Sequence, residues 1–206
     1  MTGCLGDPKV VRVYDGRVVE GRYVSPDAYA AFLRGVLAEE SGDWKGALSA
    51  YEQARNEDED DAEVWARIGA VRCRLDVKDT EIDRAFGRAA KIDPTYASAL
   101  AARSRCELSR GRPEEAAALA RAAAAADPKN AGLEALYVTA EAARRGPSGA
   151  RERAVALTLA HGSRAVAWDA LVAWGRSHRD AELVARGLEG LVRAAPGRSA
   201  EVEKGA

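Results

Sequence analysis

The sequence predicts an all-α protein, a solenoid of about five stacked helix pairs preceded by a short β-hairpin. Three observations lead to this prediction. About 45 of the 206 residues are alanine, which has the highest intrinsic helix propensity, whereas only two are phenylalanine and one is methionine. Turn signals recur at a fixed distance, and the prolines of Asp93-Pro94 and Asp127-Pro128 lie 34 residues apart. Only the beginning of the chain is rich in valine and tyrosine.

The first element, residues 9–24, is predicted to be the β-hairpin. Asp15-Gly16 separates two apolar-rich runs, and Asp-Gly readily adopts the positive φ angles of a type I′ turn. Pairing about this turn places Val13 opposite Val18 and Val11 opposite Glu20. Because an isolated two-stranded hairpin is only marginally stable in water, we expect it to pack on the first helices of its own chain. The alternative is that it adds an edge to the sheet of a partner.

Helical structure is predicted from Ser25-Pro26-Asp27 onward. Serine suits the N-cap, proline suits the first helical position, and aspartate favours the positive end of the helix dipole. The 34-residue spacing also relates Gly35 to Gly69, and Pro196 follows Pro128 at twice that distance. The predicted organisation is a tether at 1–8, the hairpin, a solenoid over 25–198 and a disordered tail at 199–206. The solenoid divides into units at about 28–61, 62–96, 97–130, 131–164 and 165–198.

These units resemble tetratricopeptide repeats, whose 34-residue signature is an aromatic, Leu-Gly, an alanine, a second aromatic and a proline. The first unit matches at Gly35, Gly42-Asp43-Trp44, Ala47, Tyr51 and Ala54. The second matches at Trp65, Gly69, Phe86, Ala89 and Asp93-Pro94. The third matches at Gly111, Ala116, Ala123 and Asp127-Pro128, but carries Ser104 and Ala120 in place of the glycine and the second aromatic. The fourth departs most, with Gly162 replacing proline, and the fifth regains Trp168 and Pro196.

The resemblance implies a right-handed superhelical solenoid whose concave face is formed by the first helix of each pair. Such a face binds a peptide or protein, so the predicted function is that of a non-enzymatic interaction module or scaffold. The groove-facing positions carried over from the family are Tyr29, Phe32, Val36, Glu63, Arg67, Arg74, Ser98 and Arg105. Some family members clamp a partner's terminal carboxylate with lysine and asparagine. The corresponding positions here hold Phe32, Val36, Ala66, Ala70 and Ala101, so that clamp is absent.

Catalytic and metal-binding signals are missing from the sequence. The two histidines, His161 and His178, have no further histidine or cysteine at ligand spacing, and no phosphate-binding or nucleophile motif occurs. We therefore expect no enzyme activity, no metal and no cofactor. With 31 basic and 32 acidic residues, the formal charge of −1 also argues against a nucleic-acid binder.

The three cysteines, Cys4, Cys73 and Cys106, are an odd number without CxxC spacing. The expectation is that Cys73 and Cys106 are buried free thiols on helices, and that neither a disulfide nor a zinc site forms. Thr2-Gly3-Cys4 resembles the end of a bacterial lipobox, although no hydrophobic leader precedes it in the sequence as written.

This motif supports an alternative function, that of a cell-envelope lipoprotein anchored through Cys4. Its repeats would help to assemble a secretion, pilus or motility complex. As written, the chain is expected to be cytoplasmic; the alternative places it in the periplasm or at the outer membrane.

The charge is distributed unevenly along the chain. Residues 25–61 have a net charge of −7, whereas residues 144–198 have a net charge of +5. A solenoid with an acidic and a basic end could stack head-to-tail with another copy or steer a dipolar partner. A solvated surface without such a role is the competing interpretation.

Overall fold

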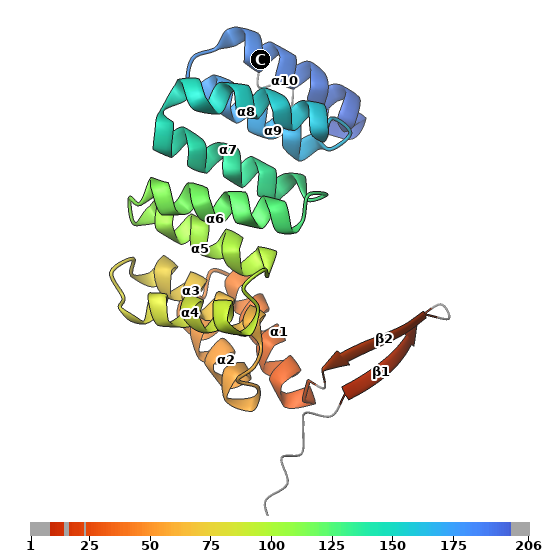
Figure 1. The fold of residues 1–206 in the computed structure, drawn as a ribbon, viewed down its shortest axis with the longest axis vertical. Helices are drawn as coiled ribbons and strands as arrows, with labels where there is room; N and C mark the ends of the chain where they lie inside the picture. Colours follow the sequence, from red (N-terminus) through yellow and green to blue (C-terminus); the bar gives the residue numbers. More distant parts are fainter. Residues whose placement is uncertain (1–8, 15–16, 23, 199–206) are drawn as a thin grey trace, which may run out of the picture.

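The computed structural model describes the backbone of residues 9–14, 17–22 and 24–198, and the side chains of 24–146 and 151–197. Within these residues ten α-helices form five antiparallel pairs, stacked from the bottom of Figure 1 to the top. The predicted all-α solenoid of helix pairs is therefore confirmed. The helices are α1 Pro26–Glu40, α2 Trp44–Glu57, α3 Ala62–Leu75, α4 Glu81–Ile92, α5 Ala97–Ser109, α6 Pro113–Ala126, α7 Ala131–Arg145, α8 Pro147–Ala160, α9 Ala165–Ser177 and α10 Ala181–Ala194, followed by a short 3-10 helix, Pro196–Arg198.

Local sequence explains where several helices begin. The Ser25 hydroxyl accepts a hydrogen bond from the Ala28 N–H at 3.0 Å, with Pro26 in the first helical position, as the sequence predicts. The carboxylates of Asp43, Asp61 and Asp180 cap α2, α3 and α10 in the same way. Each cap satisfies backbone donors that have no partner inside the helix. The recurring aspartate therefore marks the starts of helices.

The helix pairs stack so that the first helices of the second to fifth pairs form a continuous inner layer. Helix α3 contacts α5, α5 contacts α7, and α7 contacts α9, while each also packs on the second helix of its own pair. Neighbouring pairs are joined by further contacts of α2 with α3, α6 with α7 and α8 with α9. Because no single pair can cover its apolar surface, this stacking buries a series of apolar clusters along the solenoid.

Small residues on the first helices receive large ones from the second. A Cβ atom at Gly35 would lie 2.4 Å from the Tyr51 ring, and one at Gly69 would lie 3.0 Å from the Phe86 ring. The third pair solves the same contact differently. There the buried Ser104 hydroxyl donates a 2.8 Å hydrogen bond to the Ala116 carbonyl. With alanine at position 120 in place of the aromatic ring, the third pair has room for the serine side chain.

Leucine at position 116 is expected to destabilise the protein by about 1–3 kcal/mol, because Ala116 is fully buried and the added branches would overpack the contact of α5 with α6. Ala47→Leu should behave alike in the first pair, where Ala47 is also fully buried. Urea unfolding measures both variants. Ala125→Leu, an exposed site on α6, is the matched control and should change stability by less than about 0.5 kcal/mol. An Ala116→Leu protein that unfolds like the parent would contradict the assigned helix register.

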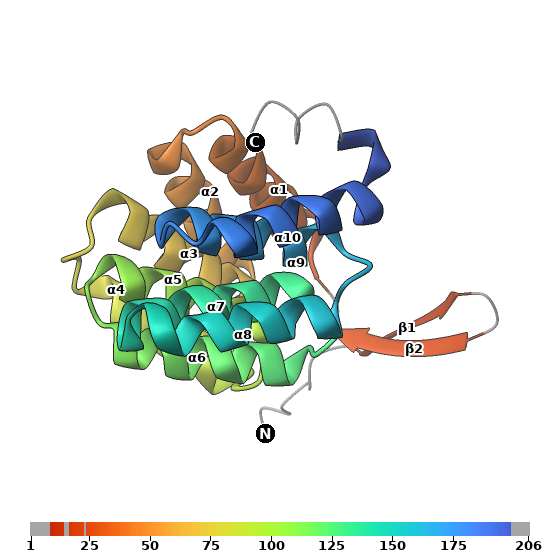
Figure 2. The ribbon, with the colours of Figure 1, turned by 90° about the horizontal axis from the view of Figure 1, so that it is seen from above.

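Two strands precede the helices, β1 Lys9–Tyr14 and β2 Arg17–Arg22. They pair antiparallel with Val13 opposite Val18 and Val11 opposite Glu20. The Asp15-Gly16 turn lies outside the described residues, and so do the tether, Cys4 and the tail. Figures 1 and 2 show the backbone of both strands extending away from the helices. Their side chains lie outside the described residues, so packing on the first helices stays a prediction.

Cys73 and Cys106 form a disulfide, so the expectation of two free thiols was wrong. Cys73 lies near the end of α3 and Cys106 near the end of α5, with 5.9 Å between their Cα atoms. The stacking of the second and third pairs brings the two positions together, whereas cysteine counting considers only spacing along the chain. The disulfide joins neighbouring repeats across the inner layer of the solenoid.

Candidate functional site

Two adjoining hollows lie along the inner layer of first helices. The first has a volume of about 900 Å³ and is lined mainly by α3, α5 and the start of α7, with Glu39 of α1 and Trp44 of α2 at one side. The second has a volume of about 540 Å³ and is lined by α5, α7 and α9. Arg105 and Gly132 line both hollows. The two hollows are therefore adjacent along the solenoid, and together they are called the groove.

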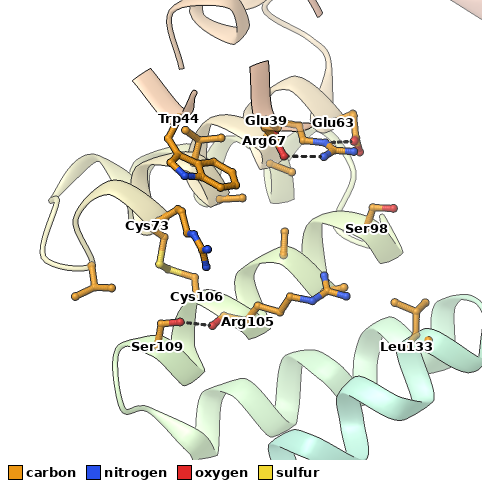
Figure 3. A pocket seen from close by; sticks show the side chains of 18 of the residues that line it. Glu39, Trp44, Glu63, Arg67, Cys73, Ser98, Arg105, Cys106, Ser109 and Leu133 are labelled. Atoms are coloured by element: carbon orange, nitrogen blue, oxygen red, sulfur yellow. Dashed lines mark hydrogen bonds and ion pairs between the residues drawn. A yellow bond between two sulfur atoms is a disulfide. The ribbon is translucent and has the colours of Figure 1, made fainter. Parts of the chain in front are cut away.

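The floor of the first hollow consists of small side chains and the disulfide. Four alanines from α3 and α5 line it, together with Cys73 and Cys106 (Figure 3); they are Ala66, Ala70, Ala101 and Ala102. Alanine leaves space above the backbone, where a longer side chain would fill the hollow. Three of the five positions compared with the carboxylate clamp, Ala66, Ala70 and Ala101, thus contribute depth to this hollow.

An ion-pair network occupies one wall of the first hollow. The Arg67 guanidinium donates to Glu63 Oε1 at 2.7 Å and to Glu39 Oε2 at 3.3 Å (Figure 3). Burial lowers the pKa of Arg67, but the hydrogen bond and charge of Glu63 and the charge of Glu39 outweigh it and raise the pKa. The Tyr96 hydroxyl donates to Glu63 Oε2, and burial together with this carboxylate raises the pKa of Tyr96 to about 12. The network leaves the charge of Arg67 engaged within the protein.

Two further arginines line the first hollow without a carboxylate partner among the described residues. The Arg74 guanidinium carbon lies 5.1 Å from the centroid of the Trp44 ring, which is cation–π geometry. The Arg105 side chain extends over the floor of the hollow (Figure 3). Both side chains belong to exposed residues. Their N–H groups can therefore donate to an acceptor that enters the groove.

The second hollow is mostly apolar. Aliphatic and aromatic side chains from α7 and α9 line it, namely Ala135, Leu136, Val138, Ala142, Val166, Ala170, Ala173 and Trp174. The His178 ring stacks on Trp174 with 4.4 Å between the ring centroids, and its Nδ1 lies 2.8 Å from the Ser177 hydroxyl. His178 therefore lines the second hollow through a ring that stacks on Trp174.

The structure separates the predicted groove residues into two sets. Five of them line the first hollow: Glu63, Arg67, Arg74, Ser98 and Arg105. The three from α1 line neither hollow: Tyr29, Phe32 and Val36. Phe32 packs on Tyr51 with 5.6 Å between the ring centroids, Val36 packs against the core of the first two pairs, and Tyr29 is 58% exposed. As a binding site, the whole set remains a prediction.

Sequence reasoning missed Trp44 and, apart from Arg105, every residue of the second hollow. Trp44 was assigned only to the repeat signature, and His178 was judged by the absence of a second ligand. Their neighbours on other helices determine their place in the groove, and sequence spacing does not show these neighbours. The alternation of small and aromatic residues on α9, including Ala170, Ala173 and Trp174, was the signal available.

Two further properties concern ligands and membranes. In the part of the chain that the structure describes, no group of three or more histidine, cysteine, aspartate or glutamate side chains is placed to hold a metal ion. Over the same residues, no helix combines the length and the apolar character required to cross a bilayer.

Stacked helix pairs with a groove along their first helices define a helical-repeat solenoid. No protein-family model matches the sequence, and no curated protein matches it. Several solved structures, however, are similar to this one. A thermophilic TPR protein of Thermus thermophilus has a TM-score of 0.67 at 15% identity, covering 85% of this chain and 95% of that one.

Two other solved structures are similar over comparable lengths. PilW, a widely conserved type IV pilus biogenesis factor, has a TM-score of 0.66 at 16% identity, covering 84% of this chain and 79% of its own. YrrB, a TPR protein with an unusual peptide-binding site, has a TM-score of 0.53 at 16% identity, covering 82% and 87%. The chain has the tetratricopeptide-repeat fold.

Proposed function

We propose that the protein is a non-enzymatic interaction scaffold that holds an extended segment of a partner protein along the groove. The adjacency of the two hollows carries this proposal. Because Arg105 and Gly132 line both, a segment that passes these two residues would contact both hollows, from α3 to α9. The lining combines an apolar surface with a few polar groups that can fix an orientation, as ligand sites commonly do.

The comparison with YrrB supports a peptide as the bound species. That protein is described as having an unusual peptide-binding site, and it shares the stacked-pair fold over most of both chains. In the present groove, the positions compared with the carboxylate clamp hold Ala66, Ala70 and Ala101 in place of lysine and asparagine. A segment bound here must therefore be recognised through other side chains.

Removing the two arginines that have no carboxylate partner is expected to weaken partner capture about tenfold or more, since charge-assisted hydrogen bonds are among the stronger ones in proteins. The variant is Arg74→Ala with Arg105→Ala. Arg67 is left intact because its network with Glu39 and Glu63 supports the wall of the groove. Quantitative mass spectrometry of affinity-captured proteins measures the effect.

The matched control is Arg121→Ala with Arg186→Ala. These arginines lie exposed on α6 and α10 and line neither hollow. The control should capture partners as the parent protein does. If the groove variant captures the same partners in the same amounts, the binding surface lies elsewhere and the proposal is wrong.

A second candidate is the cell-envelope lipoprotein that assists assembly of a secretion, pilus or motility complex. Two observations favour it. The Cys73–Cys106 disulfide is of a kind typical of oxidising compartments, and the fold is similar to that of PilW. Growth with a clickable fatty acid tests it. Labelling of the parent and not of Cys4→Ser would support a lipid anchor, and an unlabelled parent would refute it.

A further inference from the structure

We infer that the groove selects extended segments that carry one or two internal acidic side chains beside a stretch of apolar side chains. The acidic side chains would bind Arg74 and Arg105, and the apolar stretch would occupy the second hollow. This inference rests on the proposed function and adds the chemical class of the partner.

The arginines that line the first hollow differ in whether they have a carboxylate partner. Glu39 and Glu63 share Arg67, at 3.3 and 2.7 Å. Arg74 and Arg105 have no carboxylate within ion-pair distance among the described residues. An occupant without hydrogen-bond acceptors would displace water from the two guanidinium groups and leave their N–H donors without partners, which is unfavourable. A carboxylate would instead form charge-assisted hydrogen bonds with them.

Trp44 prepares Arg74 for this role. The guanidinium lies over the indole ring at 5.1 Å, so the cation is held by the ring face while its N–H edges remain available. A guanidinium fixed in this way loses less conformational entropy when it binds a carboxylate. Arg105 lies where the two hollows meet, so an acid bound there is next to the apolar part of the groove.

The geometry favours an acidic side chain within the segment over a terminal carboxylate. The groove continues past Arg105 along α7 and α9, where Leu136, Val166 and Trp174 offer apolar surface. A segment that ended at Arg105 would leave this surface uncovered. The floor of the first hollow has alanine where other repeats hold the residues of the terminal-carboxylate clamp.

Acidic side chains of the protein at both ends of the groove limit the length of the acidic stretch in a bound segment. Glu39 and Glu63 lie on the far wall of the first hollow, and Asp169 lines the second. A long polyanion would meet these carboxylates and be repelled. The lining therefore favours a peptide with a short acidic motif over a nucleic acid, whose phosphates form a continuous row of charges.

Phage display of short random peptides against the full-length protein tests the inference. The enriched peptides should share one or two consecutive Asp or Glu residues next to apolar residues. A labelled synthetic peptide from the enriched set is then measured by fluorescence anisotropy, beside a version with Gln or Asn at the acidic positions. The acidic peptide should bind about tenfold tighter or more, and this preference should weaken as salt is raised.

Variants of the protein show which residues bind the acidic side chains of the peptide. In the variant Arg74→Ala with Arg105→Ala, the ratio of the affinities for the acidic peptide and its neutral version should fall to about one. In the variant Arg121→Ala with Arg186→Ala, this ratio should be unchanged. Enriched peptides without acids, or a preference that survives in the groove variant, would overturn the inference and leave the scaffold function standing. Displacement of the acidic peptide by mixed-sequence single-stranded DNA as readily as by unlabelled peptide would also overturn it. If no peptide is enriched, the proposed peptide-binding function fails as well.

Discussion

Loss of the Cys73–Cys106 disulfide is expected to lower the free energy of unfolding by about 3–4 kcal/mol. The bond closes a loop of 33 residues, and a cross-link over a loop of this size removes that much conformational freedom from the unfolded chain. In a solenoid each repeat is stabilised chiefly by its neighbours, so a bond between the second and third pairs strengthens the stacking contact itself. Chemical denaturation of the parent with and without reductant, and of Cys73→Ala with Cys106→Ala, measures the effect.

Two comparisons make this result interpretable. Cys4→Ala should unfold like the parent under oxidising conditions, because Cys4 takes no part in the bond. The double alanine variant should show no response to reductant. If the double alanine variant is as stable as the oxidised parent, the disulfide does not stabilise the native protein.

The repeat architecture could be predicted because it depends on local signals. Asp93-Pro94 and Asp127-Pro128 follow helices at a fixed spacing, and Gly35 and Gly69 mark the positions that receive aromatic rings. These features act within one helix pair. A sequence pattern with a 34-residue period therefore contains most of the information needed to place the helices.

Contacts between pairs were predicted less well. Cys73 and Cys106 are brought together by the superhelical offset of α3 and α5, which the sequence does not reveal. Phe32 was assigned to the groove, but it packs on Tyr51 because Gly35 lets that ring approach α1. Arg67, Arg74 and Arg105 were placed on the inner face from their repeat positions alone, and they do line the first hollow. Which of them is already engaged by carboxylates could be seen only in the structure.

The buried carboxylate of Glu107 is a second feature that sequence reasoning did not anticipate. Its residue is only 1% exposed, although it lies on a helix rich in polar residues. The side chain accepts hydrogen bonds from Arg112, and the Arg103 and Arg110 guanidiniums lie 3.7 and 3.8 Å away. The Glu107 backbone carbonyl also accepts the Arg112 N–H at 2.8 Å. Glu107 thus holds the turn that connects α5 with α6.

Glu107→Leu is expected to lower the free energy of unfolding by about 3 kcal/mol, because it removes the buried carboxylate that neutralises the surrounding arginines. This loss in the free energy of unfolding lies at the lower end of the range usual for removing one partner of a buried ion pair. The reason is that the Arg103 and Arg112 side chains are 38% and 41% exposed and can be solvated by water instead. Arg110 keeps its 2.8 Å contact with Asp83. Glu107→Gln, which retains one acceptor oxygen, should fall between the parent and the leucine variant.

Glu115→Leu provides the matched control, since Glu115 is exposed on α6 and the same substitution there should change stability by less than about 0.5 kcal/mol. Urea unfolding of the single variants and of Glu107→Leu combined with Arg112→Leu separates the two ways in which Glu107 could act. If the carboxylate serves to neutralise the arginines, removing Arg112 as well should recover part of the lost stability. If Glu107→Leu is as stable as the parent, burial of the carboxylate costs as much as its ion pairs contribute, and the turn between α5 and α6 is held by its backbone hydrogen bonds alone.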